Sequence, residues 1–190
     1  MTIAILALQG AFIEHEQVLH RIGHETMEIR NLADWQRYCS EVPEADRRLV
    51  IPGGESTAMT RIMRDENLLE PLREAILHGM PVLGTCAGLI MLDPQHLATM
   101  DIRVRRNAYG RQLGSFTANA PVAGIPSANE KPFPMVFIRA PYIESAGDGV
   151  EVLATVDNHI VAARQDRQLA VAFHPELTSD TRLHELFVSF

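Results

Sequence analysis

Short apolar runs alternate with stretches of helical periodicity over the first half of the chain. The runs with the length of buried strands are residues 3–8, 26–29, 49–51 and 81–83. Helical spacing of apolar residues is found over 12–22, from 56 through 63, and over 68–77. Ser56 is placed to cap the second of these helices. The alternation of strand and helix predicts a doubly wound α/β fold, with a mostly parallel sheet flanked by helices.

The pattern changes after residue 102 to short β-like segments separated by turns rich in proline and glycine. These segments are 114–118, 135–138, 150–156, 159–163 and 169–173, and a closing helix is predicted over 181–188. We interpret them as a small antiparallel extension followed by strands that return to the main sheet. The loosest stretch, 121–134, is too short to separate two domains, so we expect residues 1–190 to form a single domain.

A cysteine stands at the end of the fourth apolar run. The segment Gly84-Thr85-Cys86-Ala87-Gly88 follows this run directly, with two glycines that flank the cysteine. This spacing is typical of a nucleophile elbow, a sharp turn from strand into helix that exposes the side chain at its apex. The first amides of the helix point at the same place, where they can hold an oxyanion and favour a thiolate. Cys86 is therefore the candidate nucleophile.

A cysteine nucleophile needs a base, and the base needs an orienting group. The run 169–173 ends at His174-Pro175-Glu176, so we expect the imidazole at the carboxyl end of a strand, beside Cys86. The Glu176 carboxylate can reach the other ring nitrogen and fix the tautomer. For His174 alone, a histidine beside an unrelated acid is an equally good interpretation. Together with the elbow, the catalytic interpretation is favoured.

Other candidate chemistry is weaker. The turn Pro52-Gly53-Gly54-Glu55-Ser56 can aim free amides into the crevice, although for this segment alone a plain turn with a helix cap is the favoured interpretation. His20 and His24 have a spacing suited to a metal, but no carboxylate or cysteine completes the site, so a solvated helix face is favoured. Cys39 has neither an elbow nor a nearby base, which indicates a structural thiol.

Composition and charge exclude several classes of function. The formal net charge is −7, without a cluster of Lys and Arg, which argues against a nucleic-acid partner. Every apolar run is far shorter than the roughly 20 residues that span a membrane, and no export signal precedes the first run. In such a chain Cys39 and Cys86 are expected to be reduced thiols, which indicates a cytoplasmic location.

The motifs together resemble a known family. The elbow around Cys86, combined with His174-Pro175-Glu176, resembles the class I, triad-type glutamine amidotransferases. Further segments are similar to those of the glutaminase subunits of pyridoxal 5′-phosphate synthases, and the resemblance extends over essentially the whole chain. These segments are 6–10, 51–57, 106–112, 136–141 and 173–178.

The resemblance implies a reaction and a site. Cys86 would attack the side-chain amide of L-glutamine, His174 would transfer the proton, and Glu176 would orient His174, giving glutamate and ammonia through a glutamyl thioester. The implied oxyanion donors are the amides of Gly54 and Ala87. The implied glutamine contacts are Gly54, Glu55, Ser56, Arg106, Ile138 and Arg139. The ammonia would pass to a partner, the synthase subunit, and the resemblance implies neither a cofactor nor a metal in this chain.

Two alternatives remain beside this hypothesis. One is a glutaminase that serves another synthase, against which the segments around Arg106 and Arg139 argue. The other is a non-catalytic regulatory subunit that senses glutamine. A pure sensor needs neither a nucleophile nor a base, so the presence of Cys86, His174 and Glu176 argues against it.

Overall fold

The computed structural model describes residues 1–106, 114–127 and 129–190. Its first strands and the strand that returns beside them are β1 (Thr2–Leu6), β2 (Glu25–Ile29), β3 (Leu49–Ile51), β4 (Val82–Thr85) and β11 (Gln168–Val171). The strands of the second half are β5 (Ile102–Arg105), β8 (Tyr142–Ala146), β9 (Glu151–Val156) and β10 (His159–Gln165). Within the described residues they form one nine-stranded sheet of order β2-β1-β3-β4-β11-β10-β8-β5, with β9 paired to β10.

The sheet has a parallel part and an antiparallel part. β2, β1, β3, β4 and β11 pair in parallel, and β10 reverses the direction against β11. The strands β3, β4 and β11 are buried at every position, as expected for a parallel sheet covered on both faces. The predicted doubly wound α/β fold is confirmed. The antiparallel part is larger than the sequence predicted, because β5 and β8 were not among the expected strands.

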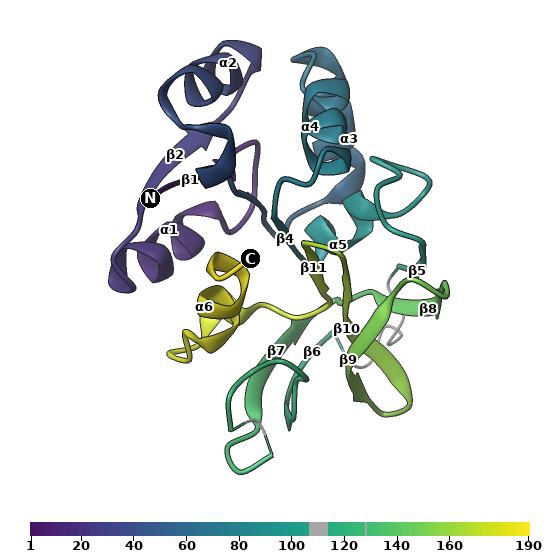
Figure 1. Cartoon of the computed structure of the whole chain (residues 1–190). Helices are drawn as coiled ribbons and strands as arrows, with labels where there is room; N and C mark the ends of the chain where they lie inside the picture. The colour runs from purple at the N-terminus through teal and green to yellow at the C-terminus, as the bar shows by residue number, and fades with distance from the viewer. Residues whose placement is uncertain (107–113, 128) are drawn as a thin grey trace.

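Helices cover both faces of the central strands. Their bounds are α1 (Phe12–Arg21), α2 (Leu32–Glu41), α3 (Ser56–Asp65), α4 (Leu69–Leu77), α5 (Ala87–Leu92) and α6 (Arg182–Val188), with short 3₁₀ turns at η1 (Glu44–Asp46) and η2 (Pro175–Leu177). Figure 1 shows α1 and α6 on one side of the central strands, and α3, α4 and α5 on the other. Helix α2 was not predicted. It buries Trp35 and Tyr38, and the Asn31 side chain caps it by accepting from the amide of Asp34 at 3.0 Å.

A separate hairpin lies beside the antiparallel part. It consists of β6 (Ser115–Ala120) and β7 (Phe133–Ile138), which pair antiparallel. Phe116 stacks on Phe137 with ring centroids 4.5 Å apart, and Phe137 meets Phe173 edge-on at 5.8 Å. The amide of His174 also donates to the carbonyl of Val136 at 2.8 Å. The hairpin therefore anchors the segment that leads out of β11.

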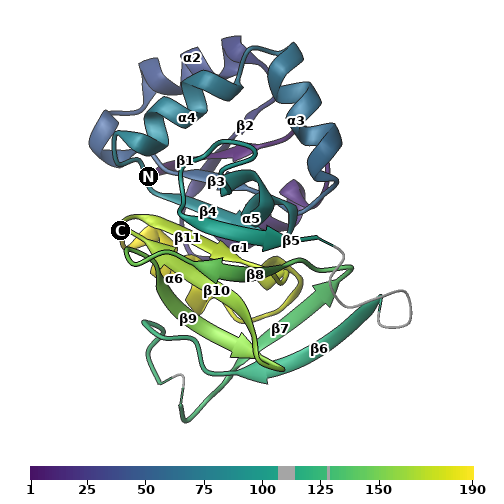
Figure 2. The same ribbon diagram turned by 90° about the vertical axis from the view of Figure 1, so that its right-hand side faces the viewer.

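The two ends of the parallel strands differ in what they carry. Figure 2 shows both chain ends at one end of the sheet, while β4 points toward the other end.

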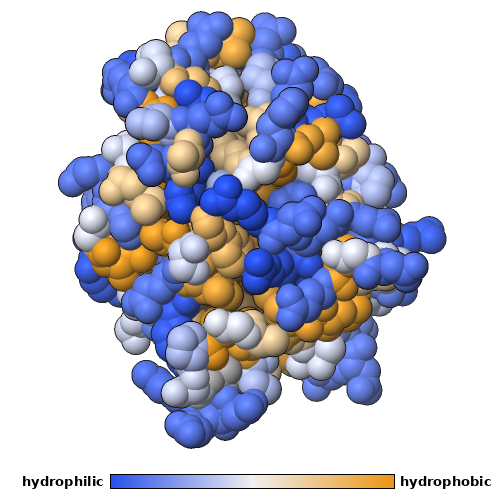
Figure 3. All heavy atoms as spheres, in the orientation of Figure 1, coloured by the Kyte–Doolittle hydropathy of each residue, from blue (hydrophilic) through white to orange (hydrophobic). Residues whose placement is uncertain are grey.

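On the face that carries the chain ends, hydrophobic side chains lie in separate small groups among hydrophilic ones (Figure 3). In the part of the chain that the structure describes, no helix is long and apolar enough to cross a bilayer.

Candidate active site

The chain turns sharply at the end of β4. Cys86 has φ 51° and ψ −101°, a strained conformation for a residue with a side chain, and its amide donates to the carbonyl of Val171 at 2.8 Å. A Cβ on Gly88 would lie 1.9 Å from the carbonyl oxygen of Ile51, and one on Gly84 would lie 2.6 Å from that of Gly88. Both glycines are required because backbones approach closely here. The turn has the geometry of the predicted elbow.

Strand register brings the histidine to the same place. Val171 of β11 pairs with Thr85 of β4 in parallel, so the residues that follow both strands emerge at the same end of the sheet. The predicted strand to Phe173 ends earlier, at Val171, and the chain then turns through His174 into η2. A Cβ on Gly53 would lie 2.5 Å from Cε1 of His174 and 3.4 Å from Cβ of Cys86. The imidazole and the cysteine thus share one neighbour.

Glu176 completes the arrangement from behind. His174 Nδ1 donates to Glu176 Oε1 at 2.6 Å, and both residues are buried. Burial lowers the pKa of His174, but hydrogen bonds to Cys86 and Glu176 outweigh it and raise the pKa to about 10. Burial raises the pKa of Glu176, but the neighbouring His15 and His174 bring it below its ordinary value. At neutral pH the pair is therefore an imidazolium beside a carboxylate.

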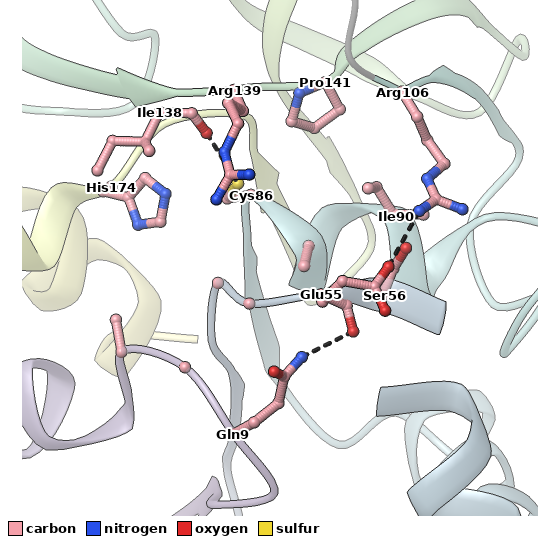
Figure 4. Close-up of a pocket in the computed structure, with 15 residues that line it drawn as sticks. Gln9, Glu55, Ser56, Cys86, Ile90, Arg106, Ile138, Arg139, Pro141 and His174 are labelled. Atoms are coloured by element: carbon pink, nitrogen blue, oxygen red, sulfur yellow. Dashed lines mark hydrogen bonds and ion pairs between the residues drawn. The ribbon is translucent and has the colours of Figure 1, made fainter. Parts of the chain in front are cut away.

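A cavity of about 530 Å³ opens in front of these groups. Nine of the ten residues predicted for the site line it, and Glu176 lies behind His174. The predicted residues that line the cavity are Gly54, Glu55, Ser56, Cys86, Ala87, Arg106, Ile138, Arg139 and His174. Figure 4 shows His174 and Arg139 near Cys86, and Arg106 with Glu55 farther along the cavity. Its volume suits a small ligand.

The turn after β3 is capped by a residue other than the one predicted. Glu55, not Ser56, caps α3: its carboxylate accepts from the amides of Thr57 at 3.0 Å and Ala58 at 2.7 Å. These bonds lower the pKa of Glu55. Glu55 also meets Arg106 at 3.2 Å. The Ser56 hydroxyl is buried and has no hydrogen-bond partner among the described residues.

Gln9 is a lining residue that the sequence did not single out. Its side-chain amide donates to the carbonyl of Glu55 at 2.7 Å, which ties the loop after β1 to the turn after β3. The Ala11 amide donates to the Gly53 carbonyl at 3.2 Å. Because a trans peptide directs its C=O and N–H oppositely, the amide of Gly54 faces away from Ala11.

Two arginines come from the second half of the chain. Arg139 has φ 44°, and its amide donates to the carbonyl of Gly114. The carbonyl of Ile138, just before it, lies 4.0 Å from Sγ of Cys86. Arg106 follows β5, and the rest of its motif, residues 107–112, lies outside the described residues. The Arg106 guanidinium also contacts the Thr57 hydroxyl at 3.4 Å.

The metal alternative for His20 and His24 finds no support in the fold. Helix α1 ends at Arg21, so His24 is not on the helix, and His20 Nε2 lies 3.0 Å from the Thr26 hydroxyl. Among the residues that the structure describes, no group of three or more His, Cys, Asp or Glu is arranged to hold a metal ion.

Comparison with known proteins assigns the family. A sequence model described as the SNO glutamine amidotransferase family matches residues 5–190. The chain belongs to this family. It is 53% identical over 196 residues to the pyridoxal 5′-phosphate synthase subunit PdxT of Streptococcus pneumoniae, covering 100% of this chain and 97% of that protein.

Solved structures agree with this membership. A crystal structure of a glutamine amidotransferase is 38% identical, with a TM-score of 0.86, and the match covers 98% of this chain and 97% of that one. A chain of the PurLQS structure from Thermotoga maritima is 14% identical, with a TM-score of 0.66 over 99% of this chain and 97% of its own. The second likeness concerns the fold alone.

Proposed function

We propose that this chain hydrolyses L-glutamine as the glutaminase subunit of a pyridoxal 5′-phosphate synthase and supplies ammonia to a partner synthase subunit. Membership of the amidotransferase family and the 53% identity to a PdxT protein support the reaction and the partner. The observation that carries the mechanism is that Cys86 and His174 both line the cavity, while Glu176 Oε1 accepts from His174 Nδ1 at 2.6 Å. The two free thiols agree with the expected cytoplasmic location.

The chemistry follows from the three side chains. His174 takes the thiol proton of Cys86, and the resulting thiolate attacks the side-chain carbonyl carbon of glutamine to form a tetrahedral intermediate. The His174 imidazolium gives its proton to the amide nitrogen, the C–N bond breaks, and ammonia leaves. Neutral His174 then removes a proton from water, and the water oxygen attacks the glutamyl thioester. The C–S bond breaks, glutamate forms, and His174 returns its proton to the departing sulfur, which restores the thiol. Glu176 holds the ring in the tautomer that both steps need.

The cavity walls supply the remaining functions. The amides of Gly54 and Ala87 are the proposed oxyanion donors, and removal of one such donor costs about 10²–10³ in turnover in other hydrolases. Ser56 offers a buried, unpartnered hydroxyl, and the guanidinium of Arg139 or Arg106 can hold the free carboxylate in two parallel hydrogen bonds. The remaining proposed contacts are with Glu55 and Ile138.

Replacement of the nucleophile tests the proposal. In the complex with the synthase subunit, we expect Cys86→Ala to abolish glutamate formation, and a glutamine analogue with a reactive carbon to label wild-type Cys86 covalently. Cys39→Ala is the matched control, because Cys39 lies in α2, outside the cavity. The activity of this variant should equal that of the wild type. Unchanged hydrolysis in Cys86→Ala would overturn this mechanism, and purely reversible binding of the analogue would favour a glutamine sensor.

A further inference from the structure

Two buried histidines lie behind the triad. His15 of α1 and His184 of α6 are each 0% exposed, and His15 Nδ1 lies 2.9 Å from His184 Nε2. The other ring nitrogen of His15 lies 3.1 Å from the hydroxyl of Thr85, the residue just before Cys86. The proposed mechanism uses neither histidine. Two buried imidazoles need a reason, since burial of polar rings is unfavourable unless they are hydrogen-bonded.

His15 also reaches the carboxylate that orients the catalytic base. Oε1 of Glu176 accepts from His174, whereas Oε2 makes no aligned hydrogen bond within the described part of the chain. His15 Nε2 lies 3.3 Å from this second oxygen, and both side chains are fully buried. A buried carboxylate oxygen needs a positive or donating partner. The structure places the His15 ring in that position.

The hydrogen-bond pattern selects one tautomer for each of the two rings, His15 and His184. If Nε2 of His15 lacked a proton, its lone pair would face the carboxylate, and its Nδ1–H would donate to His184. His184 would then carry a proton on Nδ1, which has no partner among the described residues. In the opposite arrangement, His184 Nε2–H donates to His15 Nδ1, and His15 Nε2–H points between Thr85 and Glu176. Only this arrangement leaves no buried N–H unpaired, and an unpaired buried N–H is rare in proteins.

We propose that His15 is a positioning residue for the triad, which holds the second carboxylate oxygen of Glu176 through its Nε2–H while His184 fixes its tautomer. The carboxylate is then held from both sides, by His174 in front and His15 behind. This keeps Oε1 aimed at Nδ1 of His174. The inference rests on the proposed function, because Glu176 matters only if His174 acts as the base.

The charged and titratable groups around His15 come from three elements. Glu176 faces it from η2, with His174 just before that turn, and His184 faces it from α6. Glu14 lies in its own helix, and Arg21 acts on His184. Burial lowers the pKa of both histidines, so both rings are neutral at neutral pH. A neutral N–H donor still stabilises the ionised form of the carboxylate it faces.

Replacement of His15 should change the pH dependence of catalysis. In the complex with the synthase subunit, we expect His15→Leu to lower kcat for glutamine hydrolysis about tenfold or more, with KM within about twofold, because the 3.3 Å contact of the ring N–H with the Glu176 carboxylate is lost. The same loss raises the pKa of Glu176, so the acid limb of kcat/KM against pH should move up by about one unit. The amide of His15→Gln can reach the position of Nε2, so this variant should restore most of kcat and most of the wild-type pH profile. The shorter His15→Asn should restore neither.

Tyr38→Phe is the matched control for His15→Leu, because it also removes a buried hydrogen-bonding group. The Tyr38 hydroxyl accepts from the amide of Arg48 at 2.9 Å, at the opposite end of the strands, so this change should lower stability without moving the pH profile. If His15→Leu folds and its profile of kcat/KM against pH superimposes on that of the wild type, the inference is overturned. If His15→Leu does not fold, equal activities of His15→Gln and His15→Asn would overturn it. Cys86→Ala, assayed in parallel, keeps this result separate from the proposed function: if it is inactive, the hydrolysis proposal stands whatever the His15 variants do.

Discussion

Replacing Glu176 with glutamine tests how the triad is held. The change keeps the size of the side chain and removes its charge. The rise in the pKa of His174 from 6.5 to about 10 corresponds to roughly 5 kcal/mol of preference for the imidazolium. Hydrogen bonds to both Cys86 and Glu176 produce this rise, and a hydrogen bond to a charged group contributes about 1.5–3 kcal/mol. Loss of the charge alone should therefore lower kcat about 10- to 150-fold.

The orientation of the new amide should make the loss larger. The Nε2–H of His15 faces one side of residue 176, so the amide oxygen should turn toward His15. The NH₂ group then faces Nδ1 of His174 and requires that nitrogen to be unprotonated, which places the ring proton on the nitrogen facing Cys86. This is the wrong tautomer, and in a serine triad the equivalent error costs about 10⁴ in kcat. We expect Glu176→Gln to lose about 10³–10⁴.

A double variant separates the two contributions. In Glu176→Gln/His15→Leu nothing orients the amide, so its oxygen can accept from His174, and activity should recover toward the 10- to 150-fold deficit. The assay is glutamate formation by the complex with the synthase subunit. A single variant within tenfold of the wild type would refute the role of Glu176. Equal activity of the single and double variants would refute the amide orientation.

Two further predictions concern stability. Gly88→Ala should destabilise the fold by about 1–3 kcal/mol or more in urea unfolding, since its Cβ would lie 1.9 Å from the Ile51 carbonyl oxygen, whereas Gly149→Ala, with open space around it, should be close to neutral. His15 and His184 have folded-state pKa values below 6.5, so the unfolded chain binds more protons below that pH. The free energy of unfolding should be highest above pH 6.5 and should fall below it, by up to about 1.4 kcal/mol per pH unit for each histidine. His184→Gln should make this fall less steep. An unchanged slope would contradict a lowered pKa of His184.

The sequence predicted the parallel half of the fold and most of the site because both depend on local patterns. Continuous apolar runs identify strands buried on two faces, and the carboxyl ends of such strands meet at one edge. The elbow around Cys86 and the sequence His174-Pro175-Glu176 each follow a strand of this kind. The order of the strands then brings them together, as the Val171–Thr85 register does here.

The parts that escaped prediction depend on contacts between distant residues. Helix α2 is held by Trp35 and Tyr38, whose contacts with the core join residues far apart in the sequence. The cap at Glu55 was missed because glutamate is an uncommon cap; its carboxylate is also held by Arg106, 51 residues away. His15 offered one signal. It falls on the apolar face of the first predicted helix, and a polar residue there requires a buried partner.

Helix α1 connects two parts of the site that the sequence treated separately. Just before its first turn, the Ala11 amide holds the carbonyl of Gly53, whose peptide carries the proposed oxyanion donor Gly54. One turn into the helix, His15 faces the carboxylate of Glu176. Because a helix moves largely as a rigid unit, a shift of α1 would displace the Gly53–Gly54 peptide and the contact of His15 with Glu176 together. The alignment of the proposed oxyanion donor and of the proposed base therefore depends on the position of this one helix.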